Sequence, residues 1–234
     1  MTLLEVDGIH TSYGISDVLF DISVRVEAGE SVGLLGRNGV GKSTTMRSIM
    51  GLTPPSQGSV SWKGQKVNGM PTSDIARLGV GFVPEDRRVF PDLTVWENLD
   101  IARRMHGDAE QWDEQKVYAL FPELERFRDR RGGHLSGGQQ QMLTIARSLM
   151  GNPELLLLDE PSEGLAPLVV DKLKEQIAAL QAAGLSLVLA EQNLNFVLDL
   201  SDRVYILEKG EVKFEGTSDE LRQSPELVSR YLSV

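Results

Sequence analysis

The chain has 234 residues, of which 41% are hydrophobic, so it can bury a substantial core as one large domain or as a domain with a lobe. Its formal net charge of -10 argues against a nucleic-acid-binding protein, which normally presents a basic surface. The absence of cysteine excludes disulfides, thiol chemistry and cysteine-based metal sites.

The sequence predicts neither a leader peptide nor a membrane span. Residues 1–7 have no cationic stretch followed by an apolar one, so we expect no signal peptide. The longest apolar runs, at 155–158 and 187–190, are far too short to cross a bilayer. We therefore expect a chain that is soluble on its own and reaches a membrane only through a partner.

The first part of the chain predicts a small antiparallel sheet. Apolar and polar residues alternate over 3–9 and 18–26, which is typical of strands with one buried face. Residues 59–62, followed by the turn at 63–65, indicate another hairpin. We expect these strands to lie beside the main core.

Residues 36–43 carry the most specific motif of the chain. They read Gly-Arg-Asn-Gly-Val-Gly-Lys-Ser and fit G-x-x-x-x-G-K-[ST], the loop that wraps a nucleotide's phosphates. Its glycines lack a Cβ, so the backbone can curl with its N–H groups pointing inward at an anion. Lys42 can reach the β- and γ-phosphates, and the Ser43 hydroxyl can hold Mg²⁺.

The flanks of this motif supply the context that it requires. Residues 31–35 predict a short buried strand, and residues 44–50 predict a helix whose positive end faces the phosphates. Strand, loop and helix together predict a nucleoside-triphosphate site. The residues expected to bind the nucleotide here are Gly36, Arg37, Asn38, Gly39, Val40, Gly41, Lys42, Ser43 and Thr44.

Between residues 93 and 150 the strand signal gives way to helices. A capping box opens one helix at Thr94, and further helices are predicted over 111–120, which Pro122 should end, and from Ser136. We expect a helical subdomain at 93–150, inserted between the two halves of a nucleotide-binding core, 1–92 and 151–234.

The helix predicted from Ser136 begins with a second glycine-rich pattern. Ser136, Gly137, Gly138 and Gln139 combine a capping serine with two glycines, which makes an anion-binding helix end. On these residues alone, an ordinary capped helix is an equally good interpretation.

Strand and helix patterns alternate again after residue 153, which argues for a mostly parallel sheet covered by helices. The expected strands are 155–158, 185–190 and 204–208, and the expected helices are 168–182 and 194–200.

Two acids follow the expected strand 155–158, which is apolar throughout and should be buried on both faces. Its C-terminal edge is where open α/β sheets bind ligands. We expect Asp159 to hold Mg²⁺ and Glu160 to orient and deprotonate the attacking water. The alternative is two acids that simply end a strand at the surface.

Three motifs follow one another in the chain: the phosphate loop, Leu-Ser-Gly-Gly-Gln at 135–139, and Leu-Leu-Leu-Leu-Asp-Glu-Pro-Ser at 155–162. In this order and spacing the chain resembles the ATP-binding subunits of ABC transporters over essentially its whole length. The resemblance implies a single ABC ATPase domain, 1–234, of the P-loop NTPase α/β class. It implies ATP and Mg²⁺ as cofactors. It also implies a head-to-tail dimer, in which Ser136 to Gln139 of one chain close on the γ-phosphate held by the other.

Further residue roles follow from this resemblance. Tyr13 matches the aromatic residue that stacks on adenine, although a core tyrosine is the alternative. Glu85 falls in the loop that senses the γ-phosphate and contacts the membrane subunits, where glutamine is usual, and we expect it to bind the metal together with Ser43 and Asp159. Gln192 stands where a histidine normally contacts the γ-phosphate, so we expect it to act in catalysis. Residues 163–166 occupy the dimer-contacting loop, which usually ends in aspartate.

These departures have two interpretations. One is a degenerate site that hydrolyses ATP poorly, because Gln192 cannot take up charge as an imidazole can, although it can donate a hydrogen bond. The other is a subfamily marker. Segments 83–90, 165–167 and 191–193 together resemble the ATP-binding subunits of branched-chain (hydrophobic) amino-acid importers, although Asp86 replaces a common glycine. We favour the second interpretation because Glu160 and the phosphate loop are intact.

This resemblance implies an ATPase subunit that works with two membrane permeases, a homologous ATPase subunit and, indirectly, an external substrate-binding protein. The ATPase domains would form a homo- or heterodimer, peripheral to the cytoplasmic face of the inner membrane. One alternative is the ATPase of a urea or short-amide importer. Others are an ABC ATPase outside transport, which the acidic charge and short insertion disfavour, and a module that binds ATP without hydrolysing it.

Overall fold

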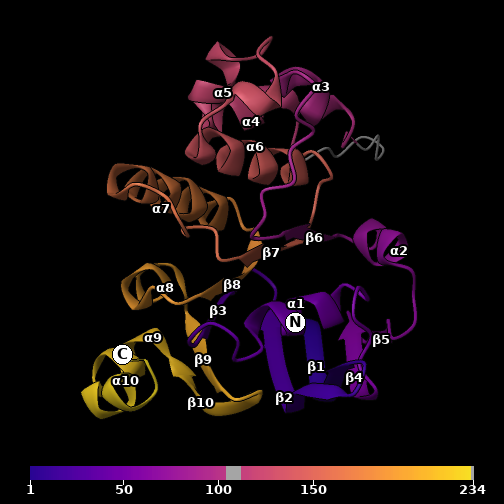
Figure 1. The fold of residues 1–234 in the computed structure, drawn as a ribbon, viewed down its shortest axis with the longest axis vertical. Helices are drawn as coiled ribbons and strands as arrows, with labels where there is room; N and C mark the ends of the chain where they lie inside the picture. The colour runs from indigo at the N-terminus through magenta and orange to yellow at the C-terminus, as the bar shows by residue number, and fades with distance from the viewer. Residues whose placement is uncertain (104–111, 233–234) are drawn as a thin grey trace.

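The computed structural model describes residues 1–103 and 112–232 and contains two β-sheets (Figure 1). The smaller sheet is antiparallel, with strand order β2-β1-β4-β5. Its strands are β1 (Thr2–Tyr13), β2 (Ser16–Glu27), β4 (Gln57–Trp62) and β5 (Gln65–Lys66). The predicted antiparallel sheet is thus confirmed, and its first two strands run further than expected, up to the turn at residues 14 and 15.

The larger sheet has the strand order β10-β9-β3-β8-β7-β6. Its strands are β3 (Ser31–Leu35), β6 (Val80–Val83), β7 (Leu155–Asp159), β8 (Ser186–Glu191), β9 (Arg203–Glu208) and β10 (Glu211–Thr217). All neighbours are parallel except β9 and β10. Every residue of β3, β7 and β8 is buried, as expected for parallel strands covered on both faces. The α/β class is confirmed.

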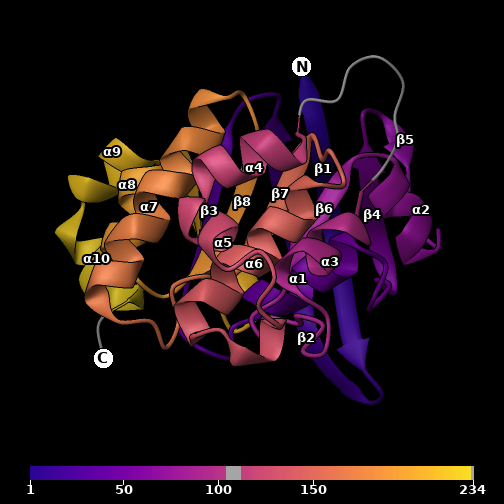
Figure 2. The same cartoon turned by 90° about the horizontal axis from the view of Figure 1, so that it is seen from above.

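Helices cover both faces of the larger sheet (Figures 1 and 2). Met46 and Ile49 of α1 (Lys42–Ile49) share one apolar cluster with strands of both sheets, so this helix is packed between them. Leu173 of α7 (Pro167–Ala182) and Phe196 of α8 (Leu194–Leu200) belong to a second cluster with β7 and β8. The remaining helices outside the segment between β6 and β7 are α2 (Thr72–Arg77), α9 (Ser218–Arg222) and α10 (Pro225–Tyr231).

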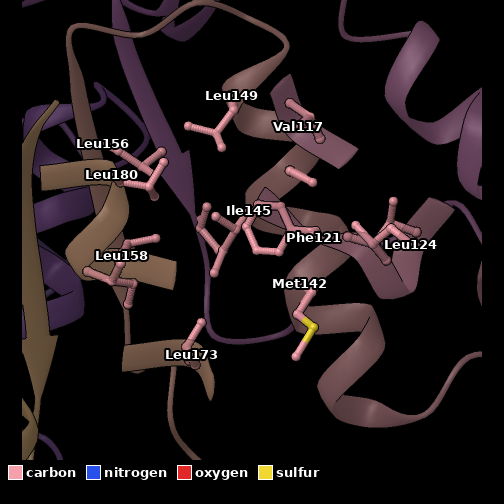
Figure 3. Packing of buried hydrophobic residues seen from close by; sticks show 14 of the residues in the cluster. Val117, Phe121, Leu124, Met142, Ile145, Leu149, Leu156, Leu158, Leu173 and Leu180 are labelled. Atoms are coloured by element: carbon pink, nitrogen blue, oxygen red, sulfur yellow. The ribbon is translucent and has the colours of Figure 1, made fainter. Parts of the chain in front are cut away.

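Between β6 and β7 the described residues form helices gathered at one end of the molecule (Figure 1). These are α3 (Val95–Asp100), α4 (Glu114–Leu120), α5 (Pro122–Arg126) and α6 (Gly137–Leu149), with a 3₁₀ turn at Gly132–His134. Phe121 and Ile145 pack in one cluster with Leu158 of β7 and Leu180 of α7 (Figure 3). The helical part is therefore anchored on the sheet through an apolar core.

Several boundaries differ from those expected. The helix predicted over 111–120 begins at Glu114, because the Asp113 side chain accepts a 2.7 Å bond from the Lys116 N–H and caps it there; residue 111 lies outside the described residues. Pro122 does not merely follow that helix but opens the next, where its missing N–H costs nothing. The short elements α2, β6, α5, β10, α9 and α10 were not predicted from the sequence.

Among residues 1–103 and 112–232, none of the helices has the length and apolar character needed to span a bilayer.

Candidate nucleotide site

Four adjacent parallel strands, β3, β8, β7 and β6, end at the same edge of the larger sheet. The phosphate loop follows β3, Gln192 follows β8, Asp159 ends β7, and Glu85 lies two residues beyond β6. The register sets Leu35 opposite Glu191. The sheet therefore brings together groups that lie far apart in the chain, at the edge where open α/β sheets bind ligands.

The phosphate loop depends on glycine at two positions. Gly41 has a φ of 111°, and a Cβ there would stand 2.5 Å from Cδ2 of Leu19. At Gly36 a Cβ would stand 2.6 Å from the Leu207 carbonyl oxygen, which belongs to a neighbouring strand. Because a backbone atom cannot move aside as a flexible side chain can, only glycine fits at position 36. α1 begins directly after the loop, at Lys42, so its free N–H groups face the loop.

Lys42 is held inside this loop. Its side chain is 2% exposed, and its ammonium donates to the carbonyl oxygens of Gly36 at 2.8 Å and Arg37 at 3.1 Å. It also forms an ion pair with Oε1 of Glu160 at 3.0 Å, and the Glu160 side chain is 6% exposed. Two buried charges thus compensate each other across the edge of the sheet.

Glu160 stands in a constrained turn directly after β7. Its φ is 45°, in the left-handed region, and its N–H donates to the Ala190 carbonyl at 2.9 Å. Gln192 Nε2 donates to Oε2 of Glu160 at 3.1 Å. Burial raises the pKa of Glu160, but the hydrogen bond and charge of Lys42, with help from Gln192, outweigh it, so that the pKa lies below its ordinary value. Glu160 is therefore an ionised, oriented carboxylate.

Asp159 and Ser43 form a second pair at this edge. The Ser43 hydroxyl donates to Oδ1 of Asp159 at 2.9 Å. Burial, joined by the charges of Glu160 and Glu85 and opposed by Ser43 and Lys42, raises the pKa of Asp159 to about 6. A hydroxyl and a carboxylate are oxygen ligands of the kind that Mg²⁺ prefers. The described residues hold no cluster of three acidic, histidine or cysteine side chains, but Mg²⁺ at a nucleotide takes its other ligands from phosphates and water.

A cleft of about 450 Å³ opens over these groups. Its lining includes half of the residues expected at the nucleotide, namely Tyr13, Asn38, Gly39, Gly41, Lys42, Ser43, Thr44, Glu85 and Glu160, and adds Val18 of β2. The expected residues Gly36, Arg37, Val40, Asp159 and Gln192 do not belong to the lining. Tyr13 ends β1 and is 44% exposed, so it is not a core tyrosine. Its hydroxyl accepts a hydrogen bond from Thr53 at 3.4 Å.

The residues Ser136 to Gln139 do not belong to the lining of this cleft. Ser136 caps α6 through a reciprocal pair of bonds. The Gln139 N–H donates to the Ser136 hydroxyl at 3.3 Å, and the Ser136 N–H donates to Oε1 of Gln139 at 3.0 Å. The predicted helix start is therefore correct, and it presents the positive end of a 13-residue helix.

Two further acids belong to the site's surroundings: Glu191, to which the sequence assigned no role, and Glu163, which it placed only in the dimer-contacting loop. Glu191, 2% exposed, accepts a 2.9 Å bond from the Ser162 N–H, and burial raises its pKa in spite of that bond. A hydrogen bond shared with Glu160, followed by burial and by the charges of Glu160 and Glu85, raises the pKa of Glu163 to about 7. Their positions in the sequence could have pointed to the site, because Glu163 directly follows the segment 155–162 and Glu191 begins the segment 191–193.

A glycine loop between β3 and α1, with a buried lysine and two acids at the end of β7, the next strand but one in the sheet, defines a P-loop nucleotide-binding protein. The ABC transporter family profile matches residues 19–163. The chain therefore belongs to the ABC transporter family, and it is one of that family's ATP-hydrolysing ATPases.

Two relatives match it over nearly their whole length. The high-affinity branched-chain amino acid transport ATP-binding protein BraG of Pseudomonas aeruginosa is 43% identical, over 98% of this chain and 99% of that protein. The lipopolysaccharide export system ATP-binding protein LptB of Haemophilus influenzae is 34% identical, over 99% of this chain and 98% of that protein.

The fold also matches a solved cassette. The ADP conformation of MJ1267, an ATP-binding cassette of an ABC transporter, has a TM-score of 0.82 and 25% identity, covering 98% of each chain. This likeness agrees with a P-loop NTPase fold, and the family binds nucleotide.

Proposed function

We propose that the cleft binds ATP with Mg²⁺, with the residue roles suggested by the contacts described above. The N–H groups of residues 36–41 and of the start of α1 would take the phosphates, and Tyr13 would stack on the adenine. Ser43 and Asp159 would hold Mg²⁺, with Glu85 beside it. Their 2.9 Å contact at the cleft supports this assignment. When bound, Mg²⁺ would neutralise the charge that develops on the phosphates.

ATP binding requires Lys42 to exchange partners. In this structure its ammonium pairs with Oε1 of Glu160. A bound β- or γ-phosphate would compete for that ammonium and release the Oε1 atom. Glu160, still held through Oε2 by Gln192, could then accept a proton from the attacking water while Lys42 stabilises the transferred group.

The complete site needs a second ATPase chain. Ser136 to Gln139 lie outside the lining of the cleft, which supports their acting on the nucleotide of a partner. The partner would be a second copy or a homologous subunit, arranged head to tail. Closure over two nucleotides would then move residues 93–150, our proposed helical subdomain, against the core formed by 1–92 and 151–234.

The closure would drive import of branched-chain amino acids through two permeases docked near Glu85 and the helical subdomain, on the cytoplasmic face of the inner membrane. The observation that carries this substrate class is the 43% identity to BraG, against 34% to LptB, at equally complete coverage. An external binding protein would deliver the amino acid.

The test is to tag this chain in its own cells, solubilise membranes gently and identify the proteins that co-purify, with untagged cells as control. Two permeases and a second ATPase, linked to a binding protein that takes leucine, isoleucine or valine, are the expected result. A binding protein selective for urea or short amides would move the assignment to that class. Lipopolysaccharide-export proteins, or recovery without any membrane protein, would contradict import.

A further inference from the structure

Arg87 joins three segments of the site: it belongs to the segment after β6 and contacts two others. It follows Glu85 in the segment after β6, its guanidinium donates to the turn after Glu160, and the same side chain lies on the start of α6. We propose that Arg87 is a positioning residue for ATP hydrolysis, which holds the turn at 160–164 and the first turn of α6 in a fixed relation to the segment at 84–88.

The first contact fixes the turn that carries Glu160. Arg87 Nη2 donates to the Glu163 carbonyl oxygen at 2.6 Å. The Glu163 N–H donates in turn to the Glu160 carbonyl at 3.2 Å, so the guanidinium is one step from the residue proposed as the base. A charged donor on a carbonyl makes a strong hydrogen bond.

The second contact fixes the start of α6. A Cβ at Gly137 would stand 2.7 Å from Nη1 of Arg87, so the guanidinium occupies the space that a larger residue would fill. The Thr144 hydroxyl, on the same helix and 1% exposed, donates to the Arg87 carbonyl at 2.7 Å. Backbone and side chain of Arg87 thus both engage α6.

The backbone of Arg87 is itself constrained. Its φ is 52°, a left-handed conformation that arginine adopts only when its surroundings impose it. The neighbouring Arg88 differs: it is exposed, and its guanidinium pairs with Asp86 at 2.7 Å on the same loop. The strain therefore coincides with the residue that bridges the three segments.

None of the atoms of Arg87 belongs to the lining of the nucleotide cleft. Its loss should therefore leave ATP affinity unchanged while it misplaces Glu160 relative to the phosphate. Small displacements of reacting groups lower turnover strongly. The expected signature is a fall in kcat at constant KM.

The experiment compares Arg87→Gly, Arg87→Lys and the control Arg88→Ala in this chain, purified together with the second ATPase chain that completes its site. Glycine removes the guanidinium and also relieves the positive φ, so Arg87→Gly should keep or raise Tm. We expect kcat to fall about 10-fold or more with KM within about twofold. The kcat of Arg87→Lys, which keeps one cationic donor, should lie between that of Arg87→Gly and that of the unsubstituted chain. Arg88→Ala should have the kcat and KM of the unsubstituted chain.

Hydrogen exchange supplies a readout that does not depend on turnover. In Arg87→Gly the amides of 160–165 should exchange faster, while those of α1 stay unchanged. Unchanged kcat and exchange, a raised KM at constant kcat, or a lowered Tm with faster exchange throughout the chain would each overturn the proposal. The test concerns hydrolysis alone, so its outcome does not depend on which molecule is transported.

Discussion

The amide of Gln192 and the lysine Lys42 hold opposite oxygens of Glu160: Gln192 Nε2 donates to Oε2 at 3.1 Å, and the Lys42 ammonium pairs with Oε1 at 3.0 Å. A phosphate can replace Oε1 as the partner of Lys42, whereas the Gln192 amide has two N–H donors and can keep its bond to Oε2 while it donates to a phosphate. Nucleotide binding would therefore free one oxygen of the carboxylate and leave the other oriented, which is the condition for a general base.

Glu160→Gln should separate binding from hydrolysis. The amide keeps the size of the side chain but cannot accept the proton of the attacking water. We expect kcat to fall by about 10²–10⁴-fold, the usual effect of a general base. ATP affinity, measured by calorimetry, should persist. Turnover equal to that of the unsubstituted chain would exclude Glu160 as the base.

Gln192→Ala should lower kcat through two effects, because the amide both orients Glu160 and can donate to the γ-phosphate. The loss of one donor aimed at transition-state charge costs about 10²-fold. Gln192→His should retain much of the activity, since an imidazole can also donate. Steady-state assays of the two variants decide the matter, and an alanine variant with full kcat would remove Gln192 from catalysis.

Lys42→Ala should lose ATP binding and also destabilise the nucleotide-free protein. It leaves Glu160 buried without its cation, a change that costs about 3–5 kcal/mol in comparable buried pairs. The double variant Lys42→Ala with Glu160→Gln should recover most of that loss, because no unpaired charge remains. Urea denaturation of the four proteins in this cycle measures the coupling; additive losses would show that the two side chains do not interact.

The same pair makes stability depend on pH. Because the folded-state pKa of Glu160 is lowered, its stabilising contribution is complete above the pKa of the unfolded chain and is lost as the pH falls through the folded-state value. Acid should therefore destabilise the unsubstituted chain more than Glu160→Gln. Parallel pH titrations of Tm for the two proteins test this, and identical acid profiles would contradict it.

Asp159 should make Mg²⁺ binding proton-linked. Its pKa is raised to about 6, so the carboxyl group is mostly protonated below that pH, whereas Mg²⁺ needs the ionised carboxylate. The Mg²⁺ dependence of nucleotide binding should weaken as the pH falls from about 7 to about 5. Asp159→Asn should reduce this pH dependence to the part that comes from the nucleotide's own phosphate, whose second pKa is also about 6, and should remove most of the Mg²⁺ requirement. Equal Mg²⁺ affinity at both pH values in the unsubstituted chain would refute the assignment.

Expectations drawn from local patterns agreed with the structure where the pattern was long or chemically specific. The apolar run at 155–158 forms β7, and the serine at position 136 caps α6. The four-residue β6 is short and contains Gly81, so its strand signal is weak. β10 does alternate between half-buried and exposed positions, as a strand with one buried face does, but this strand was not predicted. Short elements of this kind are held by their neighbours in the sheet rather than by their own residues.

The phosphate loop, the acids after the apolar strand and the α/β class could be predicted from the amino-acid order alone, because each depends on short contiguous patterns that set the local backbone geometry. Which of these groups meet depends instead on how the whole chain folds. Ser43 reaches Asp159 across 116 residues, and Arg87 reaches the Glu163 carbonyl across 76. These contacts depend on the order β3-β8-β7-β6 and on α6 packing against the sheet, since long-range pairing follows from the whole core and not from any one segment.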